Sequence, residues 1–172
     1  MAKNLIIYYS RAGGNYVNGS IDNLSKGNTE YVAEYIKKAV GGDLFEVETV
    51  KEYSQDYYKC TEEAKEEINS HARPELKEYL DKIDEYDNVF ICGHCWWGTY
   101  PMAIFSQLEK LNWSGKKVIA VMTHEGSGLG NCENDLKKIC KGTTFGKSLA
   151  IKGSDAPNSE NAVISWAKNV ID

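Results

Sequence analysis

Hydrophobic residues in this chain gather in short runs that are separated by longer stretches of helical periodicity. Runs without polar alternation are typical of parallel strands that are covered on both faces. Where Glu46 and Glu48 alternate with apolar residues, the pattern favours an edge strand with part of one face in water. The predicted strands are residues 5–9, 44–50, 89–92, 118–122 and 148–151.

The stretches between these strands place apolar residues three or four positions apart, as one face of a helix requires. Gly41 and Gly42 end the first stretch, and Pro101 opens a later one at a position that favours proline. Pro74 interrupts the least regular stretch, so a second, shorter helix is predicted after it. The predicted helices are residues 29–40, a helix through Cys60, Ala64 and Ile68, the shorter one through Leu76, Leu80 and Ile83, residues 101–111, a helix through Leu136 and Ile139, and residues 159–171.

Strands and helices alternate five times along the 172 residues, with no internal repeat and no interdomain linker. This alternation predicts an α/β fold in which right-handed crossovers build a parallel sheet with helices on both faces. We expect one domain, residues 1–172, that forms a three-layer αβα sandwich. In open sheets of this kind ligands bind beyond the carboxyl ends of the strands, so the loops that follow strands are expected to carry the function.

Composition and charge argue against several classes of function for this chain. The chain has 42% hydrophobic and 26% charged residues, as ordinary globular proteins do. The formal net charge is -5 and Lys and Arg form no basic stripe, which argues against nucleic-acid binding. The first apolar run is too short for a signal peptide or a membrane span, and an odd number of cysteines, five, suggests buried thiols in a reducing compartment. We therefore expect a soluble, cytoplasmic protein.

The loop after the first strand begins at Ser10 and, after a polar insertion, enters the first helix at residues 25–29. Backbone N–H groups at a helix start, together with Ser and Thr hydroxyls, suit a phosphate monoester. The loop contains no Walker motif and no Gly-x-Gly-x-x-Gly, which argues against a nucleoside triphosphate or a dinucleotide. An ordinary polar turn with Asn28 or Thr29 as the helix cap explains the same residues equally well.

Two further loops follow buried strands. Trp96 and Trp97 follow the third strand, where exposed tryptophans suit a flat, apolar ring system, although one Trp could simply cap the core. Gly98 would let the backbone approach a ligand closely. Residues 123–130, rich in glycine, follow the fourth strand and offer backbone donors and acceptors, or form a plain connection. A phosphate cradle, an aromatic wall and a polar rim at one sheet edge would suit flavin mononucleotide (FMN).

Three motifs suggest other chemistry and carry little weight. Cys92 and Cys95 have the spacing of a redox disulfide, but Cys92 ends a strand, so the two side chains are expected on opposite faces. Residues 142–148 are one residue short of a Walker loop and precede a strand instead of following one. His94 lies between the two cysteines, but no second Cys or His cluster completes a zinc site.

Taken together, residues 5–10, the Gly27-Asn28-Thr29 entry into a helix, the Trp96-Trp97-Gly98-Thr99 loop and residues 123–130 resemble the flavodoxins, in particular a short-chain branch with a Trp-Trp-Gly loop. The resemblance spans nearly the whole chain. It implies a five-stranded parallel sheet of order 2-1-3-4-5 and non-covalently bound FMN. The chain departs from the family in the insertion at residues 11–26 and in His94, where a proline is common.

The resemblance also implies which residues bind FMN, and it implies neither a catalytic residue nor a metal. Ser10, Asn28 and Thr29 would hold the phosphate, in a loop that includes Arg11, Ala12 and Gly27. Trp96, Trp97, Gly98 and Thr99 would flank the isoalloxazine ring. The segment from Glu125 through Gly126 to Gly128, with His124 before it, would line the pyrimidine side.

Three functions follow from these observations. The first is an electron carrier, whose net negative charge steers it towards basic redox partner proteins. The second is an NAD(P)H-dependent FMN or quinone reductase, in which His124 or Tyr100 assists proton transfer. The third is a binding or signalling module without flavin, although a receiver domain would need clustered acidic residues where Ser10 and Arg11 stand. The sequence does not predict the oligomeric state.

Overall fold

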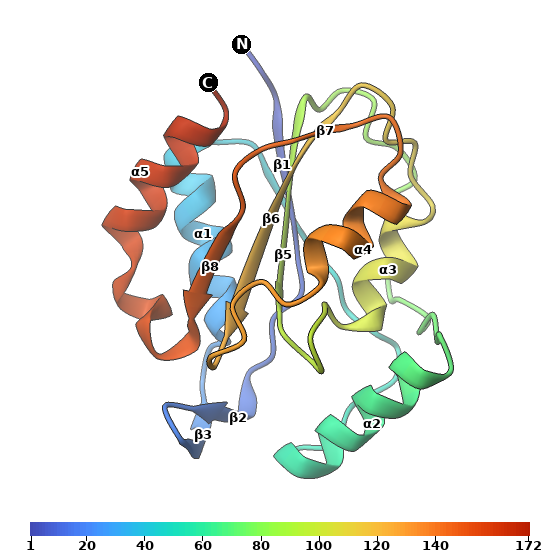
Figure 1. The fold of residues 1–172 in the computed structure, drawn as a ribbon, viewed down its shortest axis with the longest axis vertical. Helices are drawn as coiled ribbons and strands as arrows, with labels where there is room; N and C mark the ends of the chain where they lie inside the picture. Colours follow the sequence, from blue (N-terminus) through green and yellow to red (C-terminus); the bar gives the residue numbers. More distant parts are fainter.

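The computed structural model describes residues 1–172 and has a parallel sheet at its centre (Figure 1). The order of its strands is β4-β1-β5-β6-β7, and β8 also pairs with β6. This confirms the predicted α/β fold and its order 2-1-3-4-5, except that two short strands share the last position. The strands of the sheet are β1 (Asn4–Tyr8), β4 (Asp43–Glu46), β5 (Asn88–His94), β6 (Lys117–His124), β7 (Thr144–Phe145) and β8 (Leu149–Lys152).

Helices cover both faces of the sheet, which completes the three layers (Figure 1). On one face lie α1 and α5, and on the other lie α2, α3 and α4. None of these helices combines the length and the apolar composition that a bilayer crossing requires. The helices are α1 (Asn28–Val40), α2 (Tyr57–Asn69), α3 (Met102–Leu108), α4 (Cys132–Ile139), α5 (Glu160–Val170) and a 3₁₀ helix, η1 (Gly153–Asn158).

The first strand shows why its sequence is an unbroken apolar run. Successive side chains of a strand point to opposite faces. Ile6 and Tyr8 pack in the core beneath α1 and α5, whereas Leu5 and Ile7 pack in the larger core on the other face. All four are buried, because both faces of this central strand are covered.

Parallel pairing brings the loops that follow three central strands to one edge of the sheet. Tyr8 pairs with Cys92, and Cys92 pairs with Val121, so β1, β5 and β6 run in register towards that edge. Figure 1 shows both chain termini at the opposite end of the molecule. The loops predicted to carry function therefore lie together.

The insertion at residues 11–26 forms a β-hairpin, which the sequence analysis did not predict. Its strands are β2 (Gly13–Val17) and β3 (Ser20–Leu24), which pair antiparallel apart from the main sheet. The turn between them holds Asn18 and Gly19 at φ 51° and 87°. Asn-Gly is the preferred pair for a two-residue hairpin turn with positive φ at both positions. The sequence signal for the hairpin was thus present at Asn18-Gly19.

The prediction of a short helix after Pro74 is wrong. Leu76 forms an antiparallel bridge with Thr49, and the chain that follows contains bends and a turn but no helix. The backbone of Leu80 donates to Oε1 of Gln107 (2.8 Å) and accepts from its Nε2 (2.9 Å). A buried side chain of α3 therefore satisfies the peptide groups that a helix would have paired internally.

Candidate functional site

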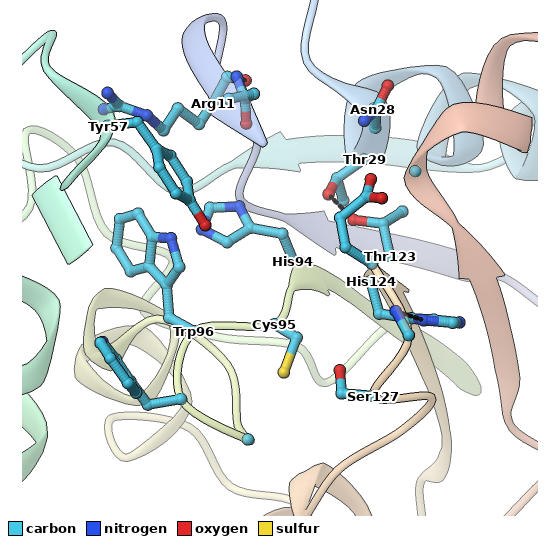
Figure 2. Close-up of a pocket in the computed structure, with 16 residues that line it drawn as sticks. Arg11, Asn28, Thr29, Tyr57, His94, Cys95, Trp96, Thr123, His124 and Ser127 are labelled. Carbon is cyan, nitrogen blue, oxygen red and sulfur yellow. Dashed lines mark hydrogen bonds between the residues drawn. The ribbon is translucent and has the colours of Figure 1, made fainter. Parts of the chain in front are cut away.

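A pocket of about 380 Å³ lies beyond the carboxyl ends of β1, β5 and β6. This is the edge at which ligands bind in open α/β sheets, and the volume falls in the range of small-molecule sites. Figure 2 shows side chains from all three loops converging on it. The predicted binding residues that line it are Arg11, Asn28, Thr29, Trp96, Trp97, Gly98, His124, Glu125 and Gly126.

Five residues predicted to bind the ligand do not line the pocket: Ser10, Ala12, Gly27, Thr99 and Gly128. The Ser10 hydroxyl accepts a hydrogen bond from the Glu30 N–H (3.0 Å) and so caps α1 from outside. The Thr99 hydroxyl is paired with the carboxylate of Asp135. Ser10 and Ala12 line a separate groove beside β4.

The start of α1 forms one end of the pocket. Gly27 precedes the helix and has no side chain with which to cap it. A Cβ at Gly27 would lie 2.1 Å from Oγ of Ser10 and 2.8 Å from the backbone oxygen of Arg11, so only glycine fits. The first N–H groups of a helix have no intrahelical partner and carry partial positive charge. This end of the pocket therefore favours an anion.

The hydroxyl of Thr29 is hydrogen-bonded to another side chain of the protein. Its Oγ1 lies 2.9 Å from Oγ1 of Thr123, the penultimate residue of β6, and both residues are buried. The pair ties the start of α1 to the end of β6. Thr29 therefore has its backbone N–H, and not its hydroxyl, to offer a ligand. The pattern of residues had indicated Thr29 as a phosphate ligand without distinguishing these two groups.

The two tryptophans play different parts. Trp96 is 6% exposed and packs edge-on against Tyr53, at 5.3 Å between ring centroids. Trp97 is 55% exposed, has φ 53°, and donates its indole N–H to the backbone oxygen of Thr61 in α2 (2.7 Å). A positive φ is uncommon for a bulky residue and needs support from its surroundings. The loop therefore presents an exposed aromatic face at the mouth of the pocket.

Gly98 and the loop after β6 are joined through the backbone. Gly98 has φ 86°, and its carbonyl accepts a hydrogen bond from the N–H of Asn131 (2.6 Å). A Cβ at Gly130 would lie 2.3 Å from the same carbonyl oxygen. The Trp-Trp-Gly loop and the glycine-rich loop after β6 thus support each other at the pocket rim.

His124 and Glu125 form the polar side of the pocket. The Nδ1 atom of His124 accepts a hydrogen bond from the N–H of Gly126 (2.9 Å), which holds the turn. Burial lowers the pKa of His124, and Lys152 adds to the effect, while Glu125 opposes it. The ring is therefore neutral near pH 7.

The hairpin β2–β3 reaches over the pocket and is held at three points. Arg11 at its base donates to the backbone oxygens of Gly14 (3.0 Å) and Ser54 (2.7 Å). Tyr16 stacks on Tyr57 of α2, with ring centroids 5.9 Å apart. At the tip, the N–H of Asn18 donates to Oε2 of Glu125 (3.1 Å). The hairpin therefore bridges α2 and the loop after β6.

Replacing Glu125 with alanine is expected to release the tip of the hairpin. Losing a hydrogen bond to a charged acceptor on the surface costs about 1 kcal/mol, so the Asn18 amide should exchange with solvent roughly fivefold faster. Hydrogen exchange followed by NMR measures this rate. Glu133→Ala, which removes a carboxylate bonded to Ser148, is the matched control. An Asn18 rate equal to that of the control variant would contradict the bridge.

Several pocket residues were not predicted. Tyr57 and Gly153 come from α2 and η1, outside the three loops that the fold singled out. His94 ends β5 and Cys95 follows it; the sequence had indicated His94 only as a departure from the family and as part of an incomplete zinc motif. The rest of this group is Asn15 and Thr123, whereas Ser127 lies within the predicted segment 125–128. For Tyr57 and Gly153 the sequence held no local signal, because their approach depends on how distant elements pack.

The cysteine pair lies as predicted. Cys92 is buried in the core beneath α1 and α5, whereas Cys95 packs against the core on the other face. All five cysteines are free thiols. Burial raises the pKa of Cys92 far above that of an ordinary thiol. The structure also contains no group of three or more His, Cys, Asp or Glu residues placed to hold a metal ion.

Solved structures similar to the chain include proposed flavoproteins from Bacteroides uniformis and Bacteroides eggerthii. Both are 26% identical to it, with TM-scores of 0.74 and 0.75; the alignments cover 97% and 100% of this chain and 98% and 99% of theirs. The flavoprotein of Lactobacillus acidophilus in complex with FMN shares the fold, at 22% identity and a TM-score of 0.65 over 98% of this chain and 100% of that one.

Comparison with curated proteins detects no relative. The family evidence therefore comes from the sequence model of the flavodoxins, which matches residues 4–170. The match begins with β1 and ends with α5, so it includes every loop of the pocket. The sheet order and the solved structures agree with it. The chain belongs to the flavodoxin family.

Proposed function

We propose that the pocket binds FMN and that the protein carries electrons. The observation that supports this most is the meeting of an anion-binding helix start, an exposed aromatic face and a polar rim in one pocket. FMN offers a matching group to each of these features: a phosphate monoester to the helix start, a flat ring to the aromatic face and a pyrimidine edge to the polar rim. The Lactobacillus acidophilus flavoprotein of the same fold, solved with FMN, is consistent with this proposal.

The residues present fit such a group. Close packing against Gly153 shapes the end of the pocket at α1, because a Cβ there would lie 2.7 Å from Nδ2 of Asn28 and 2.5 Å from Oε1 of Glu125. Arg11 adds a positive charge to the lining. We assign the phosphate to the start of α1 and the ring to the side of Trp96 and Trp97. When bound, FMN supplies a ring that accepts and releases electrons.

A reductase on the same fold is the second candidate, but Tyr100 does not support it. The Tyr100 ring is fully buried, and its hydroxyl is hydrogen-bonded to the backbone oxygens of Ile91 (2.8 Å) and Val121 (3.1 Å). A buried hydroxyl that is hydrogen-bonded to the backbone of the sheet cannot exchange protons with a substrate in the pocket. His124 is the remaining candidate for proton transfer, and its Nδ1 atom is occupied by the Gly126 N–H.

The electron partners that we propose are redox proteins with a basic surface. The formal net charge of -5 attracts such partners over distance and raises the rate of encounter. The same charge disfavours an anionic reduced flavin, which would make the protein a strong reductant. A cytoplasmic location stays a prediction from the sequence.

Titrating FMN with the purified protein tests the proposal. We expect quenching of the flavin fluorescence to saturate at one FMN per chain, and a shift of the two visible absorption bands. Steady-state assays with NADPH and a quinone then separate the two candidates, because a carrier should show almost no turnover. Unchanged fluorescence at excess protein would contradict FMN binding, and rapid turnover would favour the reductase.

Replacing Trp97 with leucine is expected to weaken FMN binding about tenfold. The substitution removes the exposed aromatic face; stacking of a planar ring on an aromatic side chain contributes about 0.5–1.5 kcal/mol beyond area burial, and the smaller leucine also buries less apolar area. Fluorescence titration measures the dissociation constant. Tyr58→Leu is the control, since Tyr58 is also an exposed aromatic residue but does not line the pocket. Equal losses in the two variants would contradict the role of Trp97.

A further inference from the structure

His94 is a pocket residue whose surroundings are mainly aromatic. It is the last residue of β5, and its ring lies 4.3 Å from that of Trp96 and 5.3 Å from that of Tyr9, both in edge-on geometry. In Figure 2 the imidazole lies in the middle of the view, with Tyr57 and Trp96 to one side of it and Asn28 and Thr29 to the other. The imidazole is therefore packed against two aromatic rings.

The Nε2 atom of His94 is buried and has no hydrogen-bond partner. It is the one buried side-chain nitrogen or oxygen of the chain in this condition. Burying a polar atom without a partner is unfavourable, and native proteins rarely do so. An unpartnered nitrogen in the wall of a binding pocket points to a partner that arrives with the ligand.

The charge state of the ring suits an uncharged partner. Burial lowers the pKa of His94 to about 3, and the nearby guanidinium of Arg11 adds to the effect. The other titratable groups that face the ring are Tyr9 and Tyr57, and burial raises the pKa of both hydroxyls, so they stay neutral as well. A neutral imidazole has one N–H donor and one acceptor nitrogen, and it can pair with a carbonyl, a hydroxyl or a ring N–H.

We propose that His94 binds the riboflavin part of FMN directly, through a hydrogen bond from its imidazole to the ring or the ribityl chain. This inference rests on the proposed function. The phosphate is assigned to the start of α1, whereas the ring contacts of His94 are Tyr9 and Trp96, on the aromatic side that is assigned to the flavin ring. His94 therefore selects for the uncharged portion of the ligand and positions it against Trp96.

Nitrogen-15 NMR of the histidine rings tests this inference on the unaltered chain. The chain has three histidines, so His71→Gln and His124→Gln variants complete the assignment. We expect the Nε2 resonance of His94 to shift when flavin-free protein is saturated with FMN, and to shift in the same direction with riboflavin. A resonance that FMN saturation leaves unmoved would overturn the inference, whatever the variants do.

Affinities of His94 variants give the second test. His94→Leu removes the hydrogen bond and should weaken FMN and riboflavin by the same factor, about ten- to hundredfold, while His94→Gln keeps a donor and should stay within about fivefold. Leucine places an apolar side chain in aromatic surroundings, so the flavin-free variant should keep its melting temperature. A lowered melting temperature with unchanged affinities would indicate a structural role only.

The two proposals fail in different ways. If the unaltered protein does not quench FMN fluorescence, the result contradicts both the proposed function and this inference. If it does, but His94→Leu binds FMN as tightly as the unaltered protein, only the role of His94 is overturned. A loss of affinity for FMN without a loss for riboflavin would also overturn it, because the partner of His94 would then be the phosphate.

Discussion

Replacing Gly27 with alanine is expected to destabilise the protein by about 1–3 kcal/mol, as crowding of a well-packed site does. The new Cβ would lie 2.1 Å from Oγ of Ser10 and 2.8 Å from the backbone oxygen of Arg11, so the loop before α1 has to move. Because the first N–H groups of α1 move with it, FMN affinity should fall by about tenfold or more, the equivalent of one lost charged hydrogen bond. Chemical denaturation and fluorescence titration measure the two effects.

A double variant separates the two causes of the crowding. Ser10→Ala with Gly27→Ala removes the hydroxyl that lies nearest the new Cβ, but it leaves the contact with the backbone of Arg11. We expect the double variant to recover part of the lost stability, although the Glu30 N–H loses its cap. If Gly27→Ala alone leaves both stability and affinity unchanged, the loop is not packed as described.

Lowering the pH from 6.5 towards 3 is expected to destabilise the flavin-free protein through His94. In the unfolded chain a histidine takes up a proton near pH 6.5, whereas burial lowers the pKa of His94 in the folded protein to about 3. Between these values the unfolded state binds more protons, so the free energy of unfolding falls as the pH falls, by up to about 1.4 kcal/mol per unit. Above pH 7 both states are neutral and the effect vanishes.

Urea denaturation at several pH values measures this slope, and His94→Gln is the matched variant. Glutamine does not titrate. The free energy of unfolding of the variant should therefore depend less steeply on pH between pH 6 and 4, by up to about 1.4 kcal/mol per pH unit, the contribution of one proton. His124 contributes in the same direction, since its pKa is also lowered, but it is present in both proteins. Equal slopes would show that His94 is not neutral and buried in the folded state.

The fold could be predicted because its signals are local. A strand covered on both faces needs apolar residues at consecutive positions, so β1, β5 and β6 appear in the sequence as unbroken hydrophobic runs. The predicted sheet order was correct except at its last position, where the chain between Phe145 and Leu149 divides the edge into β7 and β8. The predicted strand at residues 148–151 matches β8, whereas β7 is only two residues long and contains no hydrophobic run that would indicate a strand.

The hairpin and the chain after Pro74 were missed for different reasons. The hairpin had a sequence signal in Asn18-Gly19, but β2 is only partly buried and β3 is largely exposed, so hydrophobic alternation did not indicate these strands. After Pro74 the spacing of apolar residues fitted a helix, and the competing partner was Gln107, a side chain of a later helix. No local pattern contains that partner.

The sequence by itself determined the class of fold, the sheet edge at which the site lies and the three loops that build most of it, because hydrophobic periodicity and parallel topology suffice for these. Only the tertiary structure decided which side chains face the pocket. Ser10 and Thr99 turn to Glu30 and Asp135, whereas His94 keeps a nitrogen without a partner. The direction of a side chain depends on neighbours that are distant in sequence, and that information arises only when the chain has packed.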